Sequence, residues 1–174
     1  MFKTINNGTM PTKATKYSAA VDAYSNEDII IPPGETAIIG LGIYIDEDQL
    51  DKQSNDLRDA YPHYKESFYI QLSPRSSLRA KGLISGTAII DLDYTGSENE
   101  IKMIISNPVK VELDYERLAG GGQRYCGLKI DSATPYKIFR GDRIGQLMLL
   151  EHKTHMLEIT STSERTGGLG STGK

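Results

Sequence analysis

Residues 86–96, which read GTAIIDLDYTG, bring two carboxylates and a phenol together near the middle of the chain. In an extended chain, side chains alternate between faces, so we expect Asp91 and Asp93 on one face and Tyr94 on the other, until the following Thr-Gly pair turns the chain. Two neighbouring carboxylates are costly unless a cation, water or a basic partner uses them. A ligand site and a solvated hairpin end both fit this segment alone.

A phosphate-binding pattern precedes it at residues 74–83, which read PRSSLRAKGL. Arg75 offers a charged fork, Ser76 and Ser77 offer hydroxyls, and a turn here would add backbone N–H donors. A structural turn with capping serines is the alternative. The chain's three histidines show no spacing that indicates a Ser-His-Asp triad or a metal site.

Two further segments place single polar side chains in apolar surroundings. Residues 140–147 read RGDRIGQL, a turn into a strand in which Gln146 supplies a neutral donor and acceptor for a ligand. Residues 19–25 read AAVDAYS, so Asp22 is expected in an apolar strand, where pairing with an arginine is the structural alternative to a functional role.

The glycine-rich segment 165–174, RTGGLGSTGK, fits the letters of a P-loop. A P-loop also needs a buried strand before it and a helix after it, and this context is lacking. A flexible flap that wraps a phosphate chain through Arg165, Ser171 and Thr172 is one interpretation, and a disordered end is the other.

Short β-branched runs separated by Gly, Pro and Asn must position these side chains, and this spacing predicts an all-β sandwich or barrel. The runs lie at residues 28–31, 37–45, 68–72, 101–105, 136–139 and 146–150. We expect a short exposed helix within residues 46–61. Residues 46–67 and 114–134, the latter with three consecutive glycines, are expected as polar connections inside one domain.

Composition narrows the function classes. The 174 residues suffice for one domain, and a net charge of −3 with scattered basic residues argues against a nucleic-acid partner. Any phosphate ligand should therefore be small and held locally. No apolar run is long enough to cross a membrane. The lone Cys126 and a start unlike a signal peptide predict a cytoplasmic protein, or host-cytoplasmic if phage-encoded.

In their order along the chain, the five segments resemble the five motifs of the trimeric dUTP pyrophosphatase (dUTPase) family, across about residues 19–174. Motif two at 74–83, motif three at 86–96 and motif five at 165–174 are specific as a set. The resemblance implies a β jelly roll at 1–154 that assembles as a homotrimer, with an arm at 155–174 closing a neighbouring site. Insertions like 46–67 and 114–134 occur in phage and viral members, and they leave room for a regulatory protein partner.

The activity that the resemblance implies is hydrolysis of dUTP to dUMP and pyrophosphate. Asp91 matches the carboxylate that activates water, and Tyr94 the residue that packs under the deoxyribose and excludes a 2′-hydroxyl. Mg²⁺ is implied as the metal, held mainly by phosphates, with Asp22 acting through water. The implied substrate-binding residues are Arg75, Ser76, Ser77, Gly86, Ile90, Tyr94, Gln146, Arg165, Leu169, Gly170, Ser171 and Thr172. Leu169 stands where the arm usually carries an aromatic.

Two other functions remain open at this point. A dCTP deaminase shares this fold, but that family needs a glutamate on the strand after the third motif, where residues 101–106 read IKMIIS. A non-catalytic trimeric binding protein would not explain why Asp91, Gln146 and Arg165 are all present.

Overall fold

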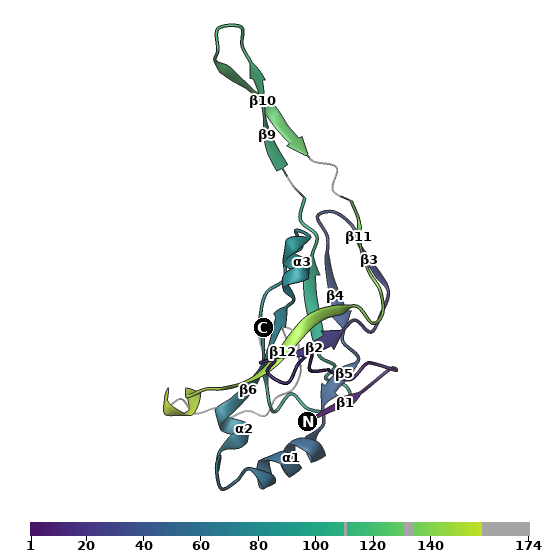
Figure 1. Cartoon of the computed structure of the whole chain (residues 1–174), viewed down its shortest axis with the longest axis vertical. Helices are drawn as coiled ribbons and strands as arrows, with labels where there is room; N and C mark the ends of the chain where they lie inside the picture. The colour runs from purple at the N-terminus through teal and green to yellow at the C-terminus, as the bar shows by residue number, and fades with distance from the viewer. Residues whose placement is uncertain (110, 131–133, 158–174) are drawn as a thin grey trace.

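The computed structural model describes residues 1–109, 111–130 and 134–157, and its core is built from antiparallel strands. A four-stranded sheet has the order β2 (Val21–Tyr24), β12 (Arg143–Glu151), β6 (Phe68–Pro74) and β7 (Ala88–Asp91). β12 lies between β2 and β6, which are both far from it in sequence, as long crossovers of an all-β fold require, whereas β6 and β7 are consecutive strands (Figure 1).

In the described part of the chain, three two-stranded ladders complete the main part of the fold, which we call the body. They pair β1 (Phe2–Thr4) with β5 (Ile43–Ile45), β3 (Ile29–Ile31) with β11 (Tyr136–Ile138), and β4 (Thr36–Gly40) with β8 (Lys102–Ser106). A 3₁₀ turn, η1 (Thr154–Leu157), follows β12.

Alternation along the strands determines which side chains form the core. In β6, Ile70 and Leu72 are buried, and Ile70 lies opposite the buried Ile90 of β7. In β8, Met103 and Ile105 are buried while Ile104 is exposed. Burying such side chains stabilises the fold by roughly 1.5–3 kcal/mol each, so a one-residue slip in register would be costly.

The helix expected within residues 46–61 is confirmed as α1 (Glu47–Asp56). The Asp46 carboxylate accepts a hydrogen bond from the backbone N–H of Gln49 (3.0 Å) and caps the helix. Leu50 is its one buried residue, as expected for an exposed helix. A short helix, α2 (Tyr64–Ser67), follows, and burial raises the pKa of its Tyr64. No helix in the described ranges is long and apolar enough to span a membrane.

The strand positions expected from the sequence are confirmed, but the expectation for residues 114–134 is wrong in its local structure. Instead of a polar loop, residues 111–130 form a β-hairpin of β9 (Val111–Arg117) and β10 (Gln123–Ile130). The hairpin projects from the body (Figure 1). Alternation of apolar and acidic residues in β9 indicated a strand, and the glycine run forms only its turn.

Candidate active site

Asp22 is the centre of a polar cluster at one end of the four-stranded sheet. It is only 4% exposed, and its carboxylate lies 3.4 Å from Nε of Arg75 and 3.3 Å from Nη1 of Arg143. It also accepts a hydrogen bond from Nε2 of Gln146 (3.4 Å). A buried carboxylate needs such partners, because desolvation of an unpaired charge is expensive. The cluster therefore orients two arginines and a glutamine together.

The strand register brings these residues together. Gln146 of β12 lies directly opposite Asp22 of β2 on one side and Ser73 of β6 on the other. Gly145 of β12 pairs with Pro74, the last residue of β6, so Arg75, which follows Pro74, lies beside the cluster. Its backbone N–H donates to the Ile144 carbonyl (3.2 Å), which fixes the point where β6 ends.

Residues 76–80 form a short helix, α3 (Ser76–Ala80), where the sequence indicated a turn. Arg75 keeps an extended backbone before it (φ −69°, ψ 145°), and Ser76 and Ser77 occupy its first turn with exposed side chains. First-turn N–H groups have no partner within a helix. The segment therefore presents hydroxyls and N–H groups beside the Arg75 guanidinium.

A surface pocket opens beside this segment, and its charged lining is mainly basic. Arg75, Lys81 and Arg143 line it together with Ser77, against the single carboxylate of Asp142. Such a lining suits an anion that carries several oxygens.

The pocket also contains a lysine–tyrosine contact that the sequence did not reveal. Lys81 donates a hydrogen bond from Nζ to the Tyr136 hydroxyl (2.8 Å), and this bond raises the pKa of Lys81. Lys81 belongs to the PRSSLRAKGL segment, so its place after Arg75 was a usable signal. Tyr136 lies 55 residues further along the chain, and no local pattern connects the two.

The two carboxylates near the middle of the chain lie at the end of β7. Asp91 is the last residue of that strand, and Asp93 follows it in a turn, so the strand ends earlier than expected. Both are exposed and the intervening Leu92 is buried. Tyr94 is half-buried against the core, and its N–H donates to the Asp91 carbonyl (3.1 Å).

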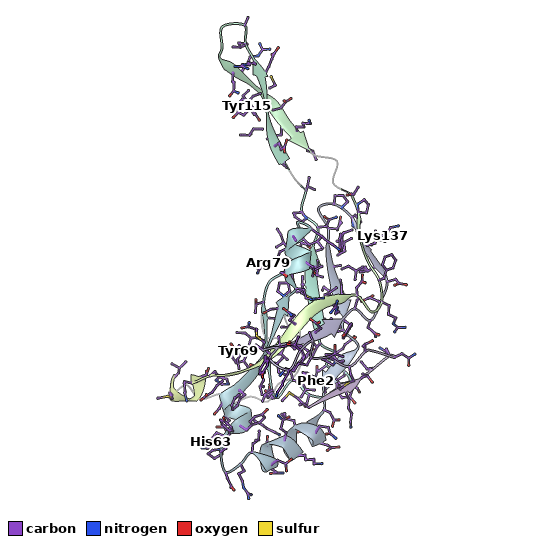
Figure 2. All side chains as sticks on the ribbon, in the orientation of Figure 1. Phe2, His63, Tyr69, Arg79, Tyr115 and Lys137 are labelled. Atoms are coloured by element: carbon purple, nitrogen blue, oxygen red, sulfur yellow. The ribbon has the colours of Figure 1, made fainter. Side chains whose placement is uncertain are left out.

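One chain does not bring Asp91 to the pocket. Asp91 pairs with Tyr69 at the start of β6, whereas Arg75 follows the end of that strand. Six extended residues span about 20 Å. In Figure 2, Tyr69, the strand partner of Asp91, lies near one end of β6, and Arg79 on α3 lies beyond the other end.

The remaining expected site residues fall into two groups. Gly86 is exposed just before β7, and Ile90 is buried within β7, so only its backbone can face a ligand. The arm residues lie outside the described residues; they are Arg165, Leu169, Gly170, Ser171 and Thr172.

The fold is thus that of an all-β protein, and its basic pocket suits a phosphate ligand. Comparison with known proteins specifies the family. The model of the dUTPase family matches residues 57–119. The deoxyuridine 5′-triphosphate nucleotidohydrolase of Candida glabrata is 30% identical, covering 97% of this chain and 91% of that protein. The rabbitpox virus enzyme is 29% identical, covering 98% and 90%. The chain belongs to the dUTPase family, and its enzyme class is dUTP diphosphatase.

Solved structures agree with the fold. The dUTPase of Staphylococcus phage 80alpha superposes with a TM-score of 0.60 at 22% identity, covering 96% of this chain and 97% of that chain. The dUTPase of phage phi11 of S. aureus gives a TM-score of 0.58 at 19% identity, covering 98% and 97%. The all-β dUTPase fold is thereby confirmed.

Proposed function

We propose that this chain hydrolyses dUTP to dUMP and pyrophosphate in a homotrimer whose active sites are shared between chains. One observation carries the shared site: within a chain, Asp91 lies at the opposite end of β6 from Arg75 and Gln146. A water-activating carboxylate must lie within hydrogen-bond reach of the reacting water. A neighbouring copy must therefore bring its Asp91 to this chain's pocket.

The triphosphate binds at the pocket beside α3. Arg75 faces Asp22 through Nε, which leaves the terminal nitrogens of its five-donor guanidinium available for phosphate oxygens. Gln146, held by the same carboxylate, adds an uncharged donor. Ser76 and Ser77 contribute hydroxyls and first-turn N–H groups. Because Asp22 fixes the basic groups in advance, little ordering is needed when the substrate arrives.

The chemical step uses Asp91 of the neighbouring chain as a general base. Its carboxylate takes a proton from water, the water oxygen attacks the α-phosphorus, and pyrophosphate leaves. Tyr94 packs under the deoxyribose and leaves no space for a 2′-hydroxyl. The backbone at Gly86 and Ile90 reads the uracil edge. The space beside the Gly86 Cα is open, since a Cβ built there would meet no atom within 4 Å.

Mg²⁺ is the proposed metal, and the oxygen donors near the pocket fit it as an ion held by phosphates and water. Among the described residues, no group of three His, Cys, Asp or Glu side chains could hold a metal. Mg²⁺ commonly keeps several waters and binds through substrate phosphates. Asp22 would support those waters indirectly, since its carboxylate accepts hydrogen bonds from Arg143 and Gln146 and forms an ion pair with Arg75. When bound, the ion neutralises charge on the triphosphate.

Residues 155–174 complete the proposed site as an arm from a neighbouring chain. Arg165, Ser171 and Thr172 would contact the phosphates, and Gly170 would allow a close backbone approach. Leu169 would cover the uracil by apolar contact.

Complementation between two inactive variants tests the shared site. Asp91→Asn and Arg75→Ala homotrimers should each be nearly inactive. After mixing and subunit exchange, about a quarter of the sites should combine an intact Asp91 with an intact Arg75 from different chains. Activity should recover to that fraction. No recovery after confirmed exchange would show that one chain supplies both residues.

Product analysis tests the reaction. The purified protein should convert dUTP with Mg²⁺ to dUMP and pyrophosphate and should leave UTP and dCTP unchanged. Formation of dUTP from dCTP would support a deaminase, and binding of dUTP without turnover would support a non-catalytic binding protein.

A further inference from the structure

The β9–β10 hairpin has one wholly apolar face over three consecutive cross-strand pairs. Register and alternation place Val111 opposite Ile130, Leu113 opposite Leu128 and Tyr115 opposite Tyr125 on that face. The two tyrosine rings meet edge to face, with centroids 5.9 Å apart. The six side chains are 49–68% exposed. We call this set of six residues the apolar strip.

The opposite face neutralises most of its own charge. Glu112 lies opposite Lys129, and Glu116 forms an ion pair with Arg124 (2.6 Å). A charged partner is therefore not required on that side. The hairpin is amphipathic in the way of a strand that packs one face into a core, yet no core lies beneath it within the described residues.

The body of the same chain does not cover the strip. Among the described strands, β9 and β10 pair only with each other. Tyr115 lies well away from the body in Figure 2. Six half-exposed side chains of this size form a patch on the order of 500 Å², near the upper limit for a soluble monomer. A two-stranded hairpin with no packing partner is marginally stable in water.

We propose that the apolar strip packs against the hairpin of another copy of this chain. The apolar strip is exposed in every folded chain, so the molecule that packs against it must be present wherever the chain is. A second copy of the chain meets that condition. The strip carries no charge over three pairs, so the identical strips of a homotrimer are compatible where all three meet around its threefold axis. Three such strips would together bury on the order of 1,000 Å² or more, which reaches the lower bound for a specific contact. This inference rests on the homotrimer of the proposed function.

Cys126, the chain's only cysteine, allows a direct distance measurement. It is exposed at the bulge of β10, with its Sγ 4.0 Å from Glu116 on the charged face, so a label there avoids the strip. Spin labels on Cys126 in the assembled protein should give a narrow distance distribution between chains. The dipolar signal should disappear when labelled chains are diluted with an excess of unlabelled chains.

A trans experiment then separates docking from the hairpin's own stability. Isotope-labelled wild-type chains are mixed into an excess of unlabelled chains carrying Leu113→Ser and Leu128→Ser, a facing pair on the strip. The wild-type hairpin keeps its own sequence, yet its amides at 111–130 should exchange at least about tenfold faster, because its neighbours no longer cover it. An excess of chains carrying Glu112→Ser and Lys129→Ser, the next pair on the charged face, should change exchange by less than about threefold.

The outcomes are distinguishable from those of the proposed function. A broad distance distribution in a protein that hydrolyses dUTP would overturn hairpin docking alone. Equal exchange in the two mixtures would do the same. A monomeric protein would overturn both the docking and the shared site. Narrow distances with the trans effect, in trimers of undiminished dUTP turnover, are the expected result.

Discussion

The polar cluster around Asp22 and the β9–β10 hairpin use the same strand alternation with opposite results. Around Asp22, adjacent side chains on opposite faces of β2, those of Asp22 and Ala23, are both buried, and the Asp22 carboxylate holds two arginines and a glutamine in position. In the hairpin, the ion pair of Glu116 and Arg124 is exposed, and no described strand of the same chain pairs with β9 or β10 to cover the apolar face. Alternation fixes a geometry only where packing completes it.

The two regions should therefore contribute differently to catalysis and stability. The body carries both the phosphate pocket and Asp91, which the proposed shared site joins from two chains. The hairpin lies outside both, and its role depends on other copies of the chain. Changes matched between the two regions test this division.

The largest effect is expected for Asp91→Asn. The amide keeps the shape of the side chain but cannot accept the proton, so kcat should fall by about 10²–10⁴. Affinity for a non-hydrolysable dUTP analogue should change little. A fall of less than tenfold would direct attention to Asp93 as the base.

The matched change in the hairpin is replacement of residues 117–125 by a short Gly-Ser turn. It should leave kcat for dUTP within a few-fold of wild type, because none of these residues lines the pocket and the hairpin pairs with no body strand among those described. A large loss with the trimer intact would instead mean that the hairpin covers the substrate where Leu169 lacks an aromatic, either through Tyr125, which the change removes, or through its partner Tyr115, which the change displaces.

A glycine comparison measures packing in the two regions. A Cβ at Gly145 would lie 2.8 Å from Cδ1 of the buried Leu72, so Gly145→Ala must displace a core side chain beside the site. We expect the free energy of unfolding to fall by about 1–3 kcal/mol. In the hairpin, a Cβ at Gly122 would lie 3.8 Å from Cδ1 of Leu118, an ordinary contact distance. Gly122→Ala should therefore change the free energy of unfolding by less than about 0.5 kcal/mol.

Urea unfolding at one fixed protein concentration measures both glycine variants, because trimer stability depends on concentration. Equal losses for the two variants would show that the hairpin is packed as tightly as the body.

Tyr94→Ala should change specificity rather than stability alone. Removing the half-buried ring opens space for a 2′-hydroxyl, so the ratio of kcat/KM for dUTP to that for UTP should fall at least about tenfold, mainly through faster UTP hydrolysis. Steady-state kinetics with both substrates measure the ratio. Tyr115→Ala removes the same ring from the hairpin and should leave it unchanged. If Tyr94→Ala also leaves it unchanged, Tyr94 only packs against the core.

Local signals predicted much of the fold. The runs of isoleucine and leucine marked the body strands, and Asp46 with the polar residues after it marked α1. The hairpin was missed because the glycine run outweighed the alternation of Val111, Leu113 and Tyr115 with acidic residues. Here the decisive signal was the two-residue period rather than the breaker.

Partners within the candidate site were harder to predict. Pairing of Asp22 with an arginine was expected as an alternative, but its actual partners Arg75 and Arg143 depend on the register of β2, β12 and β6. Asp22 and Arg143 are 121 residues apart. Sequence periodicity gives the face of each side chain, and it leaves the opposing residue undetermined.

The smallest expected effect concerns the ion pair between Lys3 and Asp46 at the edge of the body (2.7 Å). The hydrogen bond from the Lys3 ammonium lowers the pKa of Asp46 below its ordinary 3.8 and raises that of Lys3 above 10.5. Because the pKa of Asp46 is lowered by folding, its carboxylate stabilises the fold above pH 3.8, and this contribution is lost as pH falls through the folded pKa. Because the pKa of Lys3 is raised by folding, its ammonium stabilises the fold below pH 10.5, and this contribution is lost as pH rises through the folded pKa.

Lys3→Met removes the charge and keeps much of the side chain's length. The stability difference from wild type should be constant between about pH 5 and 9 and should shrink on either side of that range. Thermal unfolding across pH measures it. Arg124→Met breaks the hairpin pair with Glu116 and should leave unfolding of the body unchanged at every pH, since β9 and β10 pair with no body strand among those described. A Lys3→Met difference undiminished at pH 2 would mean that packing of the side chain, rather than its charge, stabilises this edge.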